Sequence, residues 1–152
     1  MRKIALISII GLSASLALAG GEKVQPLDIK TGLWQSTMTL TFNGLPPMEA
    51  SFMPKTITQK MCLTKKNLGQ YPFLRKNCTL KVMTSTGSKM DVTGDCVFGE
   101  GYMDHFTGHL HVLDSEHVEG TETQAITGGG RTMTADYKGT GKYVGPACGN
   151  VH

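Results

Sequence analysis

The chain has 152 residues, of which 15 are Lys or Arg, 12 are Asp or Glu and 39% are hydrophobic. This length predicts a single domain with a core of its own, and the near balance of charge does not suggest a nucleic-acid partner. The sequence contains no G-x-S-x-G nucleophile elbow and no phosphate-binding loop, so no residue pattern points to an enzyme.

The first 19 residues have the pattern of a secretory signal peptide. Arg2 and Lys3 precede the apolar run 4–18, and "ALA" at 17–19 forms an A-x-A cleavage site. The run is shorter than the roughly 20 residues that a membrane-spanning helix needs. We therefore expect a periplasmic or secreted domain over residues 20–152, with no transmembrane segment after cleavage.

The first strand is predicted from the alternation in "GLWQSTMTLTF" at 32–42. Trp34, Met38 and Leu40 share one face, and threonines occupy the other, as in a half-buried antiparallel strand. The turn residues "NGLPP" follow, and one or two strands are expected within 48–63. The stretch 64–72 is the one plausible helix, since Thr64 can cap it and Pro72 would end it.

Four cysteines follow the predicted cleavage site, which in an oxidising compartment suggests two disulfides with three possible pairings. The stretch 78–98 reads as a hairpin that turns near Gly87. If Val82 lies opposite Val92, both apolar faces coincide and Cys78 lies opposite Cys96, within bridging range. We therefore predict the disulfide Cys78–Cys96, which leaves Cys62 to pair with Cys148.

The histidines of "HFTGHLHVLDSEH", which runs from residue 105 to 117, form the one cluster of metal-ligand residue types. They lie on the polar face of a predicted strand, opposite its apolar residues. If Leu110 pairs with residue 118 of the next strand, His111 lies opposite His117 and His109 opposite Glu119. Three imidazoles and a carboxylate suit Zn or Cu. A plain solvated face and a pH-responsive surface are the alternatives.

The pattern of short strands and turns continues to residue 144. Seven to nine antiparallel strands with one short helix and two disulfides predict an all-β fold. We expect a meander that closes, or nearly closes, into a barrel, and a β-sandwich is the alternative.

Five motifs in order resemble those of a family of small exported bacterial proteins. They are "GLWQSTMTL", "MCLT", "NCTL", "GDCVF" and "GKYVGPAC", and they span residues 32–148. The family is the "domain of unknown function 3617" family. This resemblance implies a β-rich domain of the periplasm or exterior and supplies no activity.

A shorter motif, Gly32-x-Trp34 at the start of the first strand, resembles the opening of lipocalin-like (calycin) barrels. The resemblance implies that Trp34 closes the barrel floor beneath a cation from a late strand. Lys142 and Arg131 are the candidates for that cation, through a cation–π contact.

These observations leave three functions open. The first is a non-enzymatic binding protein of the cell envelope, which holds a small apolar ligand or docks on an envelope component. The second is metal binding by His109, His111, His117 and Glu119, and the third is a structural protein without a ligand. The charge is uneven, because the stretch 50–90 has eight bases and no acid. We expect neighbouring strands to neutralise each other, and the alternative is a bipolar surface with one face drawn to an anionic envelope component. The oligomeric state stays open.

Overall fold

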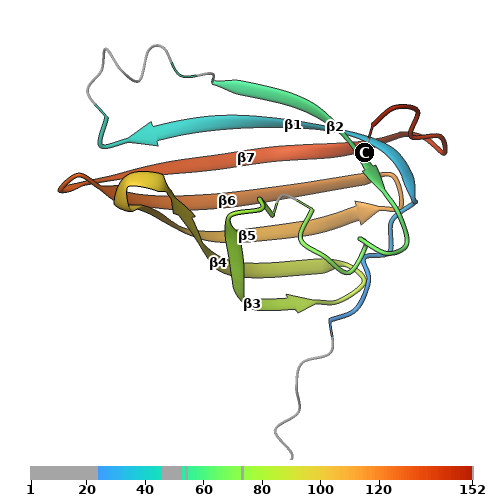
Figure 1. Cartoon of the computed structure of the whole chain (residues 1–152). Helices are drawn as coiled ribbons and strands as arrows, with labels where there is room; N and C mark the ends of the chain where they lie inside the picture. Colours follow the sequence, from blue (N-terminus) through green and yellow to red (C-terminus); the bar gives the residue numbers. More distant parts are fainter. Residues whose placement is uncertain (1–23, 46–52, 54, 73, 152) are drawn as a thin grey trace, which may run out of the picture.

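The computed structural model describes residues 24–45, 53, 55–72 and 74–151 (Figure 1). The predicted signal peptide lies outside them. The described residues form seven strands and one short 3₁₀ helix: β1 (Gly32–Asn43), β2 (Thr56–Leu63), β3 (Cys78–Ser85), β4 (Lys89–Phe98), η1 (Gly99–Gly101), β5 (Tyr102–Asp114), β6 (His117–Gly128) and β7 (Arg131–Gly145).

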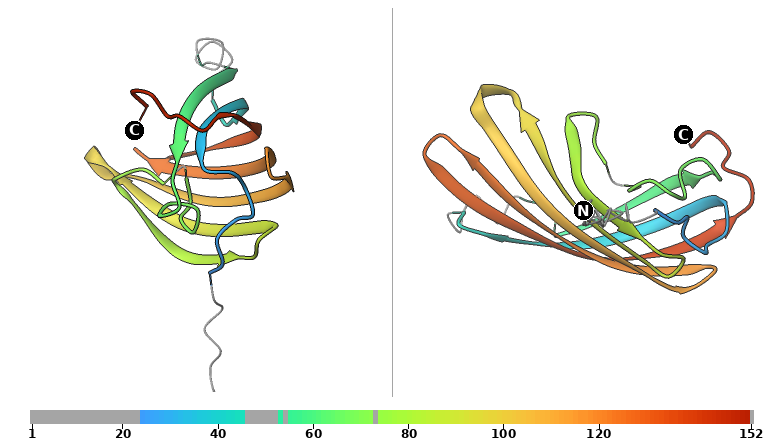
Figure 2. Two further views of the ribbon diagram at one scale, coloured as in Figure 1. Left: turned by 90° about the vertical axis from the view of Figure 1, so that its right-hand side faces the viewer. Right: turned by 90° about the horizontal axis from the view of Figure 1, so that it is seen from below.

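All seven strands belong to one antiparallel sheet, in the order β2-β1-β7-β6-β5-β4-β3. The all-β antiparallel prediction is therefore confirmed. The sheet is curved but open, since β2 and β3 form its two edges and are not neighbours in it (Figure 2). The expected closure into a barrel is thus not seen in the described strands, whereas a sandwich stays compatible with this open sheet.

The helix predicted at 64–72 is wrong. The chain instead makes successive turns, in which the amides of Asn67 and Leu68 both donate to the Thr64 carbonyl, at 3.1 and 3.2 Å. The first turn of a helix fixes several backbone dihedrals for few hydrogen bonds, so a single turn is unstable in isolation. Pro72 prevents the helix from extending further. We call the described residues of 64–77 the strap. No helix in the described part of the chain is long and apolar enough to cross a membrane.

The strap and the segment 24–31 lie on the concave face of the sheet (Figure 2). The amide of Leu27 donates to the Leu68 carbonyl at 3.2 Å, which ties the two segments together. The core lies between these segments and the apolar faces of the strands. It has two parts, one around Met90, Val92 and Phe106 and one around Trp34.

The hairpin of β3 and β4 places Cys78 directly opposite Cys96, and both predicted disulfides, Cys78–Cys96 and Cys62–Cys148, are present. The predicted pairing of Val82 with Val92 is wrong. A bulge between Leu80 and Val82 shifts the register, so that Met83 faces Val92 instead. The extra residue of a bulge changes which side chains oppose each other beyond it, while the pairs before it keep their register.

Candidate functional site

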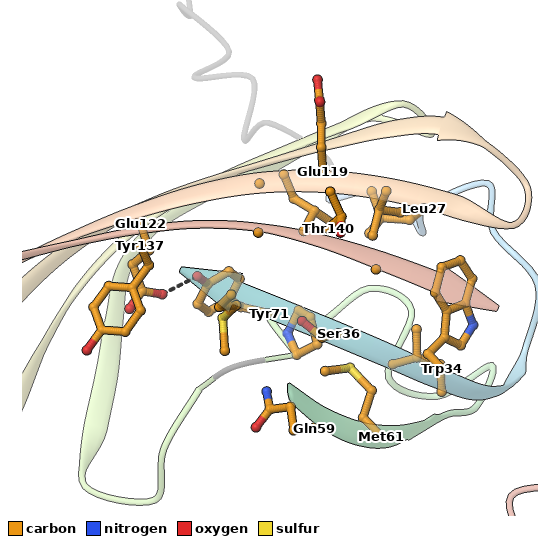
Figure 3. A pocket seen from close by; sticks show the side chains of 18 of the residues that line it. Leu27, Trp34, Ser36, Gln59, Met61, Tyr71, Glu119, Glu122, Tyr137 and Thr140 are labelled. Carbon is orange, nitrogen blue, oxygen red and sulfur yellow. Dashed lines mark hydrogen bonds between the residues drawn. The ribbon is translucent and has the colours of Figure 1, made fainter. Parts of the chain in front are cut away.

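A cavity of about 400 Å³ lies on the concave face, between the strap and strands β1, β2, β6 and β7 (Figure 3). This volume falls within the range of about 300–1,000 Å³ that is usual for small-molecule sites. The even-numbered side chains of β1 and β6 and the odd-numbered ones of β2 and β7 face it, as the two-residue period of each strand requires.

One end of the cavity is apolar. Trp34 is 2% exposed there, and Met61, Leu68 and Val118 pack around it. The indole Nε1 of Trp34 donates to the Lys30 carbonyl at 2.8 Å, which satisfies the one polar atom of this side chain. The indole is therefore fixed with its ring on the cavity wall, and Trp34 lies on the buried face that the alternation of the first strand predicts.

Glycines form part of the floor of the cavity. Gly120 on β6 and Gly139 and Gly141 on β7 line it and occupy inward-facing positions of the sheet. A Cβ at position 141 would lie 2.7 Å from Cγ2 of Val118, and one at position 139 would lie 2.8 Å from Cγ of Met38. Larger residues do not fit at these two positions, because neighbouring side chains occupy the space that a Cβ would need.

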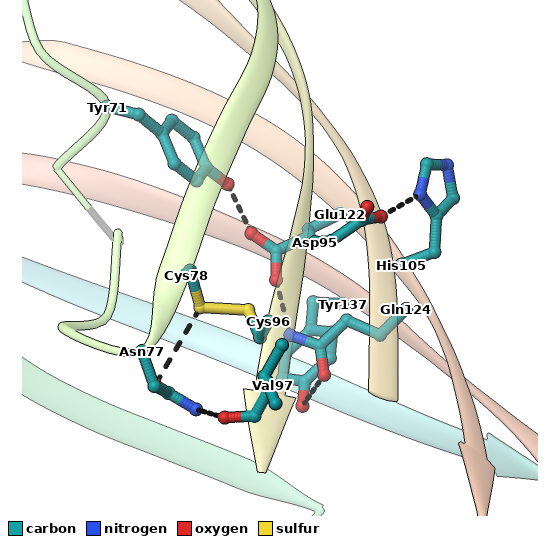
Figure 4. Close-up of a disulfide and its surroundings, with 10 residues drawn as sticks. All are labelled: Tyr71, Asn77, Cys78, Asp95, Cys96, Val97, His105, Glu122, Gln124 and Tyr137. Atoms are coloured by element: carbon teal, nitrogen blue, oxygen red, sulfur yellow. Dashed lines mark hydrogen bonds and ion pairs between the residues drawn. A yellow bond between two sulfur atoms is a disulfide. The ribbon is translucent and has the colours of Figure 1, made fainter. Parts of the chain in front are cut away.

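The opposite end of the cavity is polar (Figures 3 and 4). The Tyr71 hydroxyl of the strap donates to Oε2 of Glu122 on β6. Nε2 of Gln124 donates to Oε1 of the same carboxylate at 2.5 Å, and the Tyr137 hydroxyl donates to Oε1 of Gln124 at 3.2 Å. The four side chains form one hydrogen-bonded chain that joins the strap to β6 and β7.

Both tyrosines of this chain keep their protons. Burial raises the pKa of Tyr71, and the neighbouring Glu122 carboxylate raises it further. Burial also raises the pKa of Tyr137, against the opposing effect of the Arg75 guanidinium. The two hydroxyls are therefore hydrogen-bond donors at every physiological pH.

Asp104 on β5 lies on the same face of the sheet, directly opposite Cys96 of β4. It is 1% exposed, and neither carboxylate oxygen has a hydrogen-bond partner among the described residues. Burial raises its pKa, Arg75 lowers it, and the charge of Glu122 raises it again. A buried carboxylate without a donor is costly, so Asp104 is an unusual residue in this fold.

The four histidines between residues 105 and 117 lie on the convex face, and the structure separates them. Each one contacts a different acid through Nδ1, at distances from 2.6 to 3.4 Å: His105 with Asp95, His109 with Asp91, His111 with Glu119, and His117 with Asp114. Among the described residues, no group of three or more His, Cys, Asp or Glu side chains is placed to hold a metal ion.

The predicted pairing of β5 with β6 is wrong by two residues. Leu110 lies opposite Gly120 rather than Val118, so that His111 faces Glu119 and His109 faces Thr121. The reason is the turn. The Glu116 amide donates to the Asp114 side chain at 2.7 Å, and Asp114 pairs with His117 across two turn residues. His111 and His117 are consequently not opposite each other, and the predicted set of four ligands does not form.

The predicted contact of a late-strand cation with Trp34 is also not seen. Lys142 is exposed and lies opposite Gln35 and His117, while Arg131 is exposed at the far end of β7. The cation near this end of the sheet is Lys30, whose Nζ lies 5.4 Å from the ring centroid of Tyr143. Lys30 also pairs with Glu116.

Sequence reasoning missed Tyr71, Asp104 and Glu122. A signal for the two acids was present: Asp104 is in phase with the apolar residue Phe106, and Glu122 is in phase with Val118. An acid on the apolar face of a strand indicates a buried carboxylate. Tyr71 had no such signal, because it lies in a loop.

Comparisons with known proteins identify a family but no activity. No curated protein matches the chain significantly, and no solved structure does so either. The family described as "Protein of unknown function (DUF3617)" matches residues 29–148. This range includes the whole sheet, the strap and both disulfides. By this match, which covers most of its length, the chain belongs to the DUF3617 family.

Proposed function

We propose that the chain is an exported, non-enzymatic binding protein that holds a small and largely apolar molecule in the concave cavity. The observation that carries this proposal is the cavity of about 400 Å³, with Trp34, Met61, Leu68 and Val118 at its apolar end. Sites of this size, lined by apolar side chains and a few convergent polar groups, are typical of ligand-binding proteins.

The Cys62–Cys148 disulfide supports this function, because it joins the end of β2, which lines the cavity, to the chain beyond β7, which also lines it. A site on cross-linked strands keeps its shape without the ligand, which lowers the ordering cost of binding.

Trp34 offers a direct test, because it is the one tryptophan of the chain and lies on the cavity wall. The purified protein is titrated with N-phenylnaphthylamine, an uncharged fluorescent apolar probe, and Trp34 emission is followed. We expect saturable one-to-one binding with quenching of Trp34. Native mass spectrometry of the same protein then shows whether a molecule from the host is retained.

A pair of variants locates the bound probe. Gln59 of β2 lines the cavity, so Gln59→Phe fills part of it and should weaken probe binding at least tenfold. Lys60 is its neighbour in sequence and is exposed on the other face, so Lys60→Phe adds the same side chain outside the cavity. The proposal is refuted if the wild-type protein does not bind the probe saturably, or if the two variants bind it equally well.

A further inference from the structure

The two ends of the cavity differ in chemistry, and they are separated along one strand. Trp34 lies opposite Tyr143 of β7, whereas Glu122 lies opposite Tyr137 of the same strand. Six residues of an extended strand span about 20 Å, at about 3.3 Å per residue. A ligand that occupies the cavity lengthwise therefore has one end on the indole and the other end at Glu122 (Figure 3).

Glu122 is the acid whose carboxylate faces the cavity. Glu119 also borders the cavity, but its side chain turns to the convex face and contacts His111. The Glu122 carboxylate accepts one hydrogen bond from Tyr71 and one from Gln124. An ionised carboxylate has about four acceptor positions, so it can accept further donors from a ligand.

Arg75 and Asp104 also lie near this end of the cavity. Arg75 borders the cavity and is exposed, so solvent screens its charge. Its guanidinium also interacts with Asp104 and Tyr137, where it opposes the rise in pKa that burial causes. Asp104 adds a second, fully buried acid that has no hydrogen-bond donor among the described residues.

We propose that the ligand is an amphiphile with a hydrogen-bond-donating head, an ammonium or a hydroxyl, that binds Glu122 while its apolar chain extends toward Trp34. This inference rests on the function proposed above and adds the ligand class. An anionic head is disfavoured, because it would bring a second negative charge against Glu122 at a site that is partly removed from water.

The test compares three molecules with the same chain and different heads: decylamine, decanol and decanoate. Each displaces N-phenylnaphthylamine from the wild-type protein at pH 7, below its micelle concentration, with Trp34 emission as the readout. We expect decylamine and decanol to displace the probe at concentrations at least tenfold lower than decanoate. The inference is overturned if decanoate displaces the probe as well as the other two, in which case Arg75 decides the head group.

A matched pair of variants tests whether the Glu122 carboxylate causes the preference for decylamine over decanoate. Glu122→Gln keeps the hydrogen-bonding shape but removes the charge, so the advantage of decylamine over decanoate should shrink at least threefold. Glu119→Gln is the same change on the same strand but on the convex face, and it should leave the advantage unchanged. An unchanged advantage in Glu122→Gln also overturns the inference. If the wild-type protein does not bind the probe, the proposed function fails, and that outcome is distinct from an altered order of the three heads.

Discussion

Gly108 of β5 lies directly under the Tyr71 side chain of the strap: a Cβ at position 108 would come within 2.7 Å of the Tyr71 hydroxyl oxygen. The ring of Tyr71 also stacks on Phe106, with 6.1 Å between the centroids and 13° between the planes. The absence of a side chain at Gly108 therefore lets Tyr71 of the strap pack directly against the backbone of β5. The strap in turn forms a wall of the cavity, so the shape of the site depends on this contact.

Replacing Gly108 tests this contact with Tyr71. Gly108→Ala should displace Tyr71 and lower the free energy of unfolding by about 1–3 kcal/mol, the usual cost of overpacking a core. Urea denaturation measures the loss. Gly69 lies in the strap itself with no atom within 4 Å of an added Cβ, so Gly69→Ala should change stability by about 0.5 kcal/mol or less. Equal changes in the free energy of unfolding for the two variants would show that the strap does not depend on the contact at position 108.

Removing the Tyr71 hydroxyl should also loosen the strap. Tyr71→Phe keeps the ring on Phe106 but deletes the donor to Glu122, and a hydrogen bond to a charged group contributes about 1.5–3 kcal/mol. We expect a loss of this size in urea denaturation. Tyr102→Phe removes a hydroxyl from a side chain that is 40% exposed and should have little effect. No difference between the two variants would contradict the assigned role of Tyr71.

The contribution of Asp104 to the free energy of unfolding should decrease as the pH rises. Its pKa is raised in the folded chain, chiefly by burial, so the folded state binds the proton more tightly than the unfolded state does. The stabilising effect of this proton is complete below about pH 4, the usual range for aspartate, and is lost as the pH rises through the raised value. Asp104→Asn should therefore stabilise the protein at pH 7, by about 1 kcal/mol, and lose this advantage at low pH.

Replacing Asp with Asn should have the opposite effect on stability at Asp95. Hydrogen bonds from Lys81 and His105 hold its pKa below the usual value, so its contribution is present above that range and is lost as the pH falls. Asp95→Asn should accordingly destabilise the protein at pH 7, where Asp104→Asn stabilises it. Thermal unfolding from pH 3 to pH 8 measures both, and the same sign for both variants at pH 7 would refute the assignment.

The two disulfides should differ in their contribution to stability. Cys62–Cys148 closes a loop with a sequence separation of 86, and Cys78–Cys96 one of 18. Loop entropy assigns about 4.5 kcal/mol to the longer loop and about 3 kcal/mol to the shorter one. Replacing each pair with serines and comparing urea midpoints measures the difference. A larger loss from the Cys78–Cys96 pair would indicate that native-state contacts, rather than chain entropy, decide the order.

The sequence predicted much of the fold because the strands are long and half-buried. The alternation around Trp34 and that around Phe106 each identified the buried face correctly, since a strand repeats every two residues. Register was harder to predict. It depends on single side chains and bulges, such as the hydrogen bond that Asp114 accepts in the turn before β6, and no periodicity encodes these.

The cavity could not be predicted in this way. Its polar end depends on a contact between Tyr71 and Glu122, which are 51 residues apart in the chain. The strap carries no periodic pattern, so nothing in the sequence indicated where it would lie. The floor depends on glycines such as Gly139, which look like ordinary turn or bulge residues until the neighbouring strands are placed.

The position of β7 has a consequence for how the protein is made. The strands β3 to β6 follow one another in both the chain and the sheet, but β1 pairs with β7, the last of the described strands. β1 and β2 can therefore join the rest of the sheet only after β7 has been made. Because β7 also lines the cavity, the cavity lacks one of its walls until β7 has joined the sheet.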